Sequence, residues 1–85
     1  MKQADVVLKA LLAVIRQERE RRGLNYEDFS VAAGLHRTTL GLYERGERGP
    51  TVEAALSMAQ ALGIPLSELL RKAENQASGN PVSEQ

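Results

Sequence analysis

Apolar residues recur along this chain at intervals of three and four positions, the period of an α-helix, and no segment shows the strict alternation of a strand. Glycine follows directly after four of these segments, where a helix commonly ends in a left-handed residue: Gly23, Gly34, Gly46 and Gly63. These boundaries predict five helices, at about residues 4–22, 25–33, 37–45, 52–62 and 65–74. We therefore expect an all-α fold, a compact five-helix bundle.

The predicted helices have suitable residues at their ends and an apolar stripe along one side. Asn25 and Thr51 can each cap a helix N-terminus, and Asp28 follows Asn25 at the spacing of a capping box. The stripe of the first helix comprises Val7, Leu8, Leu11, Leu12 and Ile15, and that of the fourth comprises Val52, Ala55, Leu56, Ala59 and Leu62. We expect these stripes to face the core.

Residues 23–46 combine two short helical patterns with one tight turn at Gly34, which predicts a helix-turn-helix. Ser30 supplies the small residue that is needed where the two backbones approach each other. The apolar positions expected to hold the two helices together are Phe29, Leu35, Leu40 and Tyr43.

Length and composition limit the other possibilities. A chain of 85 residues permits one small domain, and without cysteine it has neither a disulfide nor a thiolate metal site. No apolar run is long enough to cross a bilayer and no secretory signal is present, so we expect a soluble, cytoplasmic protein with no membrane contact. We divide the chain into a helical extension at 1–10, a helix-turn-helix domain at 11–74 and a disordered tail at 75–85, which is rich in Gln, Ser, Gly, Asn and Pro.

The charges of the chain cancel. Eleven Lys and Arg balance eleven Asp and Glu, which argues against a generic binder of polyanions. Residues 1–49 have nine positive and seven negative side chains, whereas residues 50–85 have two and four. Any basic surface must therefore be local.

A helical wheel of residues 37–45 separates an inner side from an outer side. Leu40 and Tyr43 point one way, and the opposite side has Arg37, Thr38, Gly41, Leu42 and Arg45. The outer residues either solvate a surface helix or contact a ligand. An exposed glycine inside a helix costs about 1 kcal/mol relative to alanine, so Gly41 favours a ligand that approaches the backbone closely.

Seven short segments follow one another in a characteristic order: Ile15-Arg16, Gly23-Leu24-Asn25, Gly34-Leu35, Arg37-Thr38-Thr39, Glu44-Arg45-Gly46, Pro50-Thr51-Val52-Glu53 and Ala59-Gln60-Ala61-Leu62-Gly63. Over about residues 11–72, this order resembles the XRE family of Cro- and phage-repressor-like DNA-binding domains. Among its members, the chain looks most similar to short stand-alone regulators such as restriction-modification controller proteins. The resemblance implies a lambda-repressor-like fold whose helix at 37–45 enters the major groove of double-stranded DNA.

The resemblance also implies a set of DNA-binding residues, namely Asn25, Tyr26, His36, Arg37, Thr38, Thr39, Gly41, Leu42, Arg45 and Arg48. Arg37 suits a bidentate contact with guanine, and Thr38 offers a hydroxyl or a methyl group to a base edge. Arg45, Arg48 and the N-terminus of the helix at 25–33 are expected at phosphates, although Glu47 weakens the basic character of the loop after Arg45.

Two positions, Tyr26 and Leu42, have a second interpretation, and two others are interpreted as structural alone. Tyr26 stands where relatives commonly have glutamine, and it either contacts phosphate or packs against the helix at 37–45. Leu42 packs on thymine methyl groups or marks a protein-binding surface. The family pairs the positions of Arg19 and Glu44 in a partly buried ion pair, so both are interpreted as structural.

An enzyme is not expected, because the chain has one histidine, no cysteine and no glycine-rich phosphate loop. His36 lacks a second ligand for a metal and is expected to cap a helix or contact backbone, so we expect no metal and no cofactor. The function expected is that of a sequence-specific regulator of transcription that binds double-stranded DNA as a homodimer. The interface between the two copies is expected to consist of Leu66, Leu69 and Leu70. The alternative is an antitoxin or another helix-turn-helix module with a protein partner.

Overall fold

The computed structural model describes residues 3–78, and within this range it consists of five helices and no strand. The helices are α1 (Gln3–Arg21), α2 (Tyr26–Ala33), α3 (Arg37–Glu44), α4 (Val52–Leu62) and α5 (Leu66–Ala77). The all-α, five-helix prediction is confirmed, with helix ends within three residues of those expected. Side-chain caps at the starts of α2, α3 and α4, and left-handed glycines after α2 and α4, give these ends a local cause in the sequence.

Capping side chains and left-handed glycines set these ends. The Asn25 side-chain oxygen accepts a hydrogen bond from the Asp28 N–H at 2.8 Å, and Thr51 Oγ1 accepts one from the Ala54 N–H at 3.0 Å. Gly34 has φ 68°, and its N–H donates back to the carbonyls of the last turn of α2. This left-handed residue turns the chain from α2 into α3, as the position of the glycine predicts.

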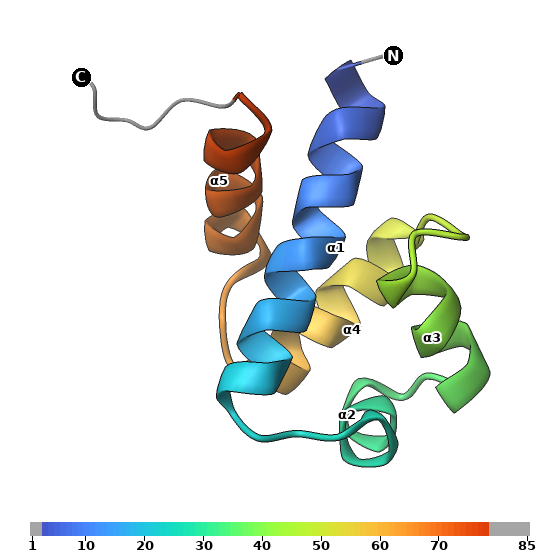
Figure 1. The fold of residues 1–85 in the computed structure, drawn as a ribbon. Helices are drawn as coiled ribbons and strands as arrows, with labels where there is room; N and C mark the ends of the chain where they lie inside the picture. Colours follow the sequence, from blue (N-terminus) through green and yellow to red (C-terminus); the bar gives the residue numbers. More distant parts are fainter. Residues whose placement is uncertain (1–2, 79–85) are drawn as a thin grey trace.

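The helices form two groups (Figure 1). α1 and α5 run antiparallel, side by side, and α4 crosses behind α1. α2 and α3 lie on the other side of α1 from α5, joined by the short turn at Gly34. All five helices contribute to the core, whose largest fully buried side chains are Phe29, Ile15, Leu40, Met58, Leu69 and Val14.

α4 is rotated relative to the stripe predicted for it. Val52 is 73% exposed and Leu56 is 47% exposed, so their expected burial is wrong. The buried side of α4 comprises Ala54, Ala55, Met58, Ala59 and Leu62. Because α4 packs against α1, α2 and α5, its buried side is centred on Met58, and the small alanines beside it permit close approach of the neighbouring helices.

α5 differs from the prediction in two respects. Leu69 is fully buried in the core together with Ala73, so Leu69 cannot contribute to a contact between two copies of the folded chain. Leu66 and Leu70 are half-buried at the edge of the same core. In addition, α5 continues through Ala77, so residues 75–77 of the predicted disordered tail are helical, whereas residues 79–85 lie outside the described range.

α1 is one continuous helix, without a break between the extension at 1–10 and the domain that follows. Glu18, on its inner side, is only 6% exposed and accepts hydrogen bonds from Arg22 Nη1 at 2.5 Å and from Lys72 Nζ of α5 at 3.4 Å. Arg21 Nη1 lies 3.7 Å from the same carboxylate. The hydrogen bond from Arg22 is the main cause that lowers the pKa of Glu18, so the carboxylate stays ionised and ties α5 to α1.

Candidate nucleic-acid interface

Apolar side chains of α2, α3 and the turn between them pack against one another. Phe29 and Leu40 are fully buried, Tyr43 is 6% exposed, and Leu35 packs against them from the turn. Ser30 is buried and donates its hydroxyl to the Glu27 carbonyl at 2.9 Å. The predicted set of residues that joins the two helices is therefore confirmed. This packing fixes which side of α3 faces outward.

The N-terminal turn of α3 presents polar side chains to solvent. His36 Nδ1 accepts a hydrogen bond from the Thr38 N–H at 3.2 Å, which confirms His36 as a helix cap. Arg37 and Thr38 are exposed beyond this cap, whereas Thr39 is half-buried. Arg37 Nη1 lies 3.6 Å from the Glu27 carboxylate in the first turn of α2. The two residues expected to contact base edges are thus at the accessible start of α3.

The expectation that Gly41 is exposed is wrong. Gly41 is buried because the Arg45 side chain, one turn later, folds back over it. A Cβ at position 41 would lie 3.0 Å from Arg45 Nη1. The glycine therefore leaves room for an arginine of the same helix, and a ligand is not needed to explain it. Leu42, the next residue, is half-buried.

The C-terminal end of α3 combines positive and negative side chains. Arg45 Nε donates a hydrogen bond to the Glu47 carboxylate at 2.9 Å, and this bond is the main cause that raises the pKa of Arg45. Arg48 is exposed in the loop that follows. The N–H groups of Glu47 and Arg48 both donate to the Leu42 carbonyl, so the loop is folded back against the last turn of α3.

The start of α2 has two expected contact residues with different surroundings. Asn25 is exposed, and its side-chain oxygen caps α2. Tyr26 is half-buried, and its ring lies beneath the Arg19 guanidinium with 4.9 Å between Cζ and the ring centroid. The structure shows Tyr26 packed against an arginine of α1, whereas the packing considered from the sequence was against the helix at 37–45.

An ion pair links α3 to α1. Arg19 donates two hydrogen bonds to the Glu44 carboxylate, from Nε at 2.7 Å and from Nη2 at 3.1 Å, and a third to the Leu24 carbonyl at 2.6 Å. The Arg19 side chain is 11% exposed and that of Glu44 is 4% exposed. The hydrogen bonds with Glu44 are the main cause that raises the pKa of Arg19. The expected structural pair is present, and it fixes α3 against the body of the protein.

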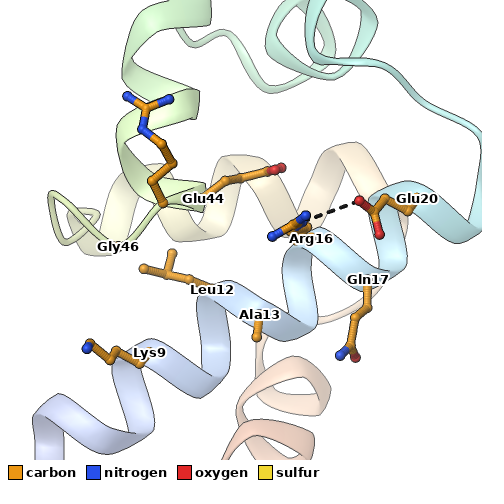
Figure 2. Close-up of a pocket in the computed structure, with 9 residues that line it drawn as sticks. Lys9, Leu12, Ala13, Arg16, Gln17, Glu20, Glu44 and Gly46 are labelled. Atoms are coloured by element: carbon orange, nitrogen blue, oxygen red, sulfur yellow. Dashed lines mark hydrogen bonds and ion pairs between the residues drawn. The ribbon is translucent and has the colours of Figure 1, made fainter.

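A groove of about 440 Å³ lies between α1 and the end of α3. Figure 2 shows Lys9, Leu12 and Arg16 along its α1 side and Glu44 and Gly46 along its α3 side, with Arg16 bonded to Glu20 at 3.3 Å. Its rim therefore has charges of both signs. Within residues 3–78, no cluster of three or more His, Cys, Asp or Glu could hold a metal ion. No helix in this range is long and apolar enough to span a bilayer.

Two short helices that are joined by a tight left-handed turn at Gly34 and packed on each other, with the second helix accessible on its outer side, form a helix-turn-helix. Residues 15–69 match the family model HTH_3, described as helix-turn-helix, and the chain belongs to this family, which is of the XRE type. The family comprises DNA-binding transcriptional regulators, which are not enzymes.

Two curated relatives illustrate the range of the family. The chain is 34% identical over 76 residues to the control protein C.SmaI of Serratia marcescens, a match that covers 85% of this chain and 90% of that protein. It is 33% identical over 60 residues to the cryptic phage CTXphi transcriptional repressor RstR of Vibrio cholerae, covering 71% of this chain and 54% of the repressor. The chain thus spans about half the length of RstR and nearly the whole control protein.

Two solved structures share the fold. The clp gene regulator ClgR of Corynebacterium glutamicum has a TM-score of 0.80 and 24% sequence identity, with 92% of this chain and 83% of that chain covered. A point mutant of the restriction-modification controller protein C.Esp1396I also has a TM-score of 0.80, with 20% identity and coverage of 87% and 96%. These similarities support the fold of a helix-turn-helix regulator.

Proposed function

We propose that the protein is a cytoplasmic, sequence-specific regulator of transcription that binds double-stranded DNA as a homodimer, with α3 in the major groove. The observation that carries this proposal is the outer side of α3, where Arg37 and Thr38 are exposed while Leu40 and Tyr43 hold the helix from within. An α-helix fits the width of the major groove, and side chains at its N-terminal end reach base edges most directly.

The exposed residues divide into two roles. Arg37 pairs with guanine through O6 and N7, and Thr38 contacts the neighbouring base edge. Arg45, Arg48 and the N-terminus of α2 contact phosphates on either side of the groove, where cations and backbone N–H groups are suited to anions. Three other residues of the expected set are less accessible than Arg37 and Thr38, so they contribute less to the DNA contact: Gly41 is buried, and Thr39 and Tyr26 are half-buried.

A dimer is proposed because one helix reads too few base pairs for useful specificity, and two-fold symmetric sites on DNA match two-fold symmetric proteins. With Leu69 in the core, the apolar residues of α5 that remain available are Leu66 and Leu70. Sedimentation at micromolar concentration should show a species of twice 9.3 kDa. A 9.3 kDa species alone would contradict this part of the proposal.

The decisive experiment compares Arg37→Ala with Arg48→Ala. The target duplex is first selected from a random-sequence pool with the wild-type protein, and a scrambled duplex serves as the reference. Arg37→Ala should weaken binding to the target by about 1–3 kcal/mol per half-site and relax the preference at one base pair, because a bidentate contact is lost. Arg48→Ala should weaken binding to both duplexes equally and reduce the slope of log K against log salt by about one unit. Equal loss on both duplexes for Arg37→Ala would remove it as a base-reading residue.

The second candidate function is that of an antitoxin or another helix-turn-helix module that binds a protein partner. Val31 of α2 is 71% exposed, and this exposed apolar side chain is the observation that favours a protein contact. It lines a groove of about 510 Å³ together with Leu35 and the polar residues Glu27, Ser30, His36, Arg37 and Thr38. The two functions overlap where a protein-binding module also binds DNA, but if protein binding is the main function, neither Arg37→Ala nor Arg48→Ala will discriminate between DNA sequences. Leu42→Ala will then be more damaging to partner binding than Arg37→Ala.

A further inference from the structure

The surface that is proposed to face DNA includes the carboxylates of Glu27, Asp28 and Glu47, and two of them, Glu27 and Glu47, lie beside arginines. Glu27 lies in the first turn of α2, with its side chain 66% exposed, and Glu47 lies in the loop after α3, with its side chain 55% exposed. Neither side chain contributes to the core. Negative charge at these positions opposes the approach of phosphates, so its presence requires an explanation.

The carboxylates of Glu27 and Glu47 are each paired with one arginine of the proposed DNA-contacting set. Glu27 Oε1 lies 3.6 Å from Arg37 Nη1, and Glu47 Oε2 accepts a hydrogen bond from Arg45 Nε at 2.9 Å. The two arginine side chains are 67% and 53% exposed. At this exposure an ion pair is weak enough to exchange its partner for a base edge, or for a phosphate that a base contact brings into register.

The position of Arg45 supports this exchange. Its guanidinium lies over Gly41 while it is bonded to Glu47, so in the free protein it is folded along the helix surface. A Cβ at position 41 would meet only the end of this flexible side chain. Because Gly41 has no side chain, the Arg45 guanidinium fits against the helix at this position. From there the Arg45 side chain can rotate outward without a change of the backbone.

We propose that Glu27 and Glu47 determine specificity by holding Arg37 and Arg45 in neutral pairs until the target sequence offers better acceptors. This inference rests on the proposed DNA-binding function. On DNA of arbitrary sequence, affinity comes from phosphate neutralisation, and two arginines that remain paired contribute little to it. On the target, Arg37 leaves Glu27 for a guanine edge, and Arg45 leaves Glu47 for the adjacent phosphate. The carboxylates therefore weaken non-specific binding more than specific binding.

The test uses Glu27→Gln, Glu47→Gln and the double variant of the full chain. Glu74→Gln is the matched control, because it makes the same change of charge at an exposed position of α5, on the other side of α1 from α2 and α3 (Figure 1). Affinity is measured for the selected target and for a scrambled duplex over a range of salt concentrations. Thermal melting verifies that every variant is folded.

Each of the two substitutions should strengthen binding to scrambled DNA by about 1.5- to 5-fold relative to the control, the range that corresponds to breaking an exposed ion pair. The salt slope on scrambled DNA should become steeper by about one unit, because one more cation meets a phosphate. The gain on the target should be smaller, so the ratio of target to scrambled affinity should fall, and most strongly in the double variant.

Two results would overturn the inference. The first is that Glu27→Gln and Glu47→Gln bind both duplexes with the same affinity as the control Glu74→Gln. The other is an equal gain on both duplexes, which would mean that the carboxylates reduce affinity without contributing to specificity. Failure of the wild-type protein to select any sequence contradicts the proposed function instead, so the two failures are distinguishable.

Discussion

Glu44 and Arg45 are neighbours in the chain, yet they belong to opposite sides of α3. Glu44 points inward, where its 4% exposed side chain accepts two hydrogen bonds from Arg19 of α1. Arg45 points outward, where it is 53% exposed and pairs with Glu47, two residues further along the loop. The inner pair joins two helices across 25 positions of sequence, whereas the outer pair is local.

This comparison shows that one residue type has two physical roles on a small domain. Arg19 is held by Glu44, by the Leu24 carbonyl and by the ring of Tyr26, so its position is fixed by three different elements. Arg37 and Arg45 have one carboxylate each and a large exposed fraction. The inner arginine therefore sets where α3 lies, and the outer arginines remain available for a ligand.

The largest effect expected is on the inner pair. Glu44→Ala leaves the buried Arg19 guanidinium without its carboxylate, which should lower the free energy of unfolding by about 3 kcal/mol. The melting temperature should fall by more than about 10 °C in a domain of this size. Circular dichroism of the variant during heating measures the change.

Glu47→Ala is the matched control for the outer side, because it removes a carboxylate from an exposed pair at the other side of the same helix end. Its melting temperature should equal that of the wild type. If the two variants melt at the same temperature, the distinction between the inner and outer pairs is wrong.

A second prediction concerns the two adjacent leucines of α5. Leu69→Ala should lower the free energy of unfolding by about 2–4 kcal/mol, because Leu69 is fully buried and its truncation leaves a cavity. Leu70→Ala should cost less stability, since Leu70 is half-buried, and it should shift the equilibrium from dimer to monomer. Urea unfolding together with sedimentation separates the two effects. A monomeric but fully stable Leu69→Ala variant would contradict the placement of Leu69 in the core.

The smallest effect is expected from Glu18 and depends on pH. Its folded-state pKa lies below the ordinary glutamate value of 4.5, mainly because of the hydrogen bond from Arg22, with Arg21 and Lys72 adding to the effect. A lowered folded-state pKa stabilises the protein above the ordinary value, and this contribution is lost as pH falls through the folded-state pKa. The wild type should therefore melt at a higher temperature than Glu18→Gln near pH 7, and the difference should shrink as pH falls below 4.5. A difference that is constant with pH would exclude the carboxylate charge as its cause.

Much of the fold was predictable because its determinants are local. The caps at Asn25, His36 and Thr51 each act within three residues, and Gly34 turns the chain by its own left-handed conformation. The packing of Phe29 against Leu40 follows from helical period and one short turn. The pair of Arg19 and Glu44 was expected from the family resemblance.

The incorrect predictions have causes that are not local. The rotation of α4 is set by three other helices, which bury Met58 and leave Val52 exposed. Leu69 is buried for the same kind of reason, since one stripe of α5 faces both α1 and α4. The burial of Glu18 was missed because it depends on the packing of α5, whose Lys72 lies 54 residues away, whereas its partner Arg22 is local. The burial of Gly41 depends on the direction of the Arg45 side chain, which the pattern of residues does not specify.

The antiparallel arrangement of α1 and α5 has a practical consequence. α1 begins and α5 ends at the same end of the molecule, remote from α2 (Figure 1). Ala4 and Gln76 are exposed near these two helix ends. A fluorescent dye attached at either position, or a surface immobilised through it, would leave the turn between α2 and α3 open to solution. The same end of the fold offers two attachment points for single-molecule or biosensor measurements of this small protein.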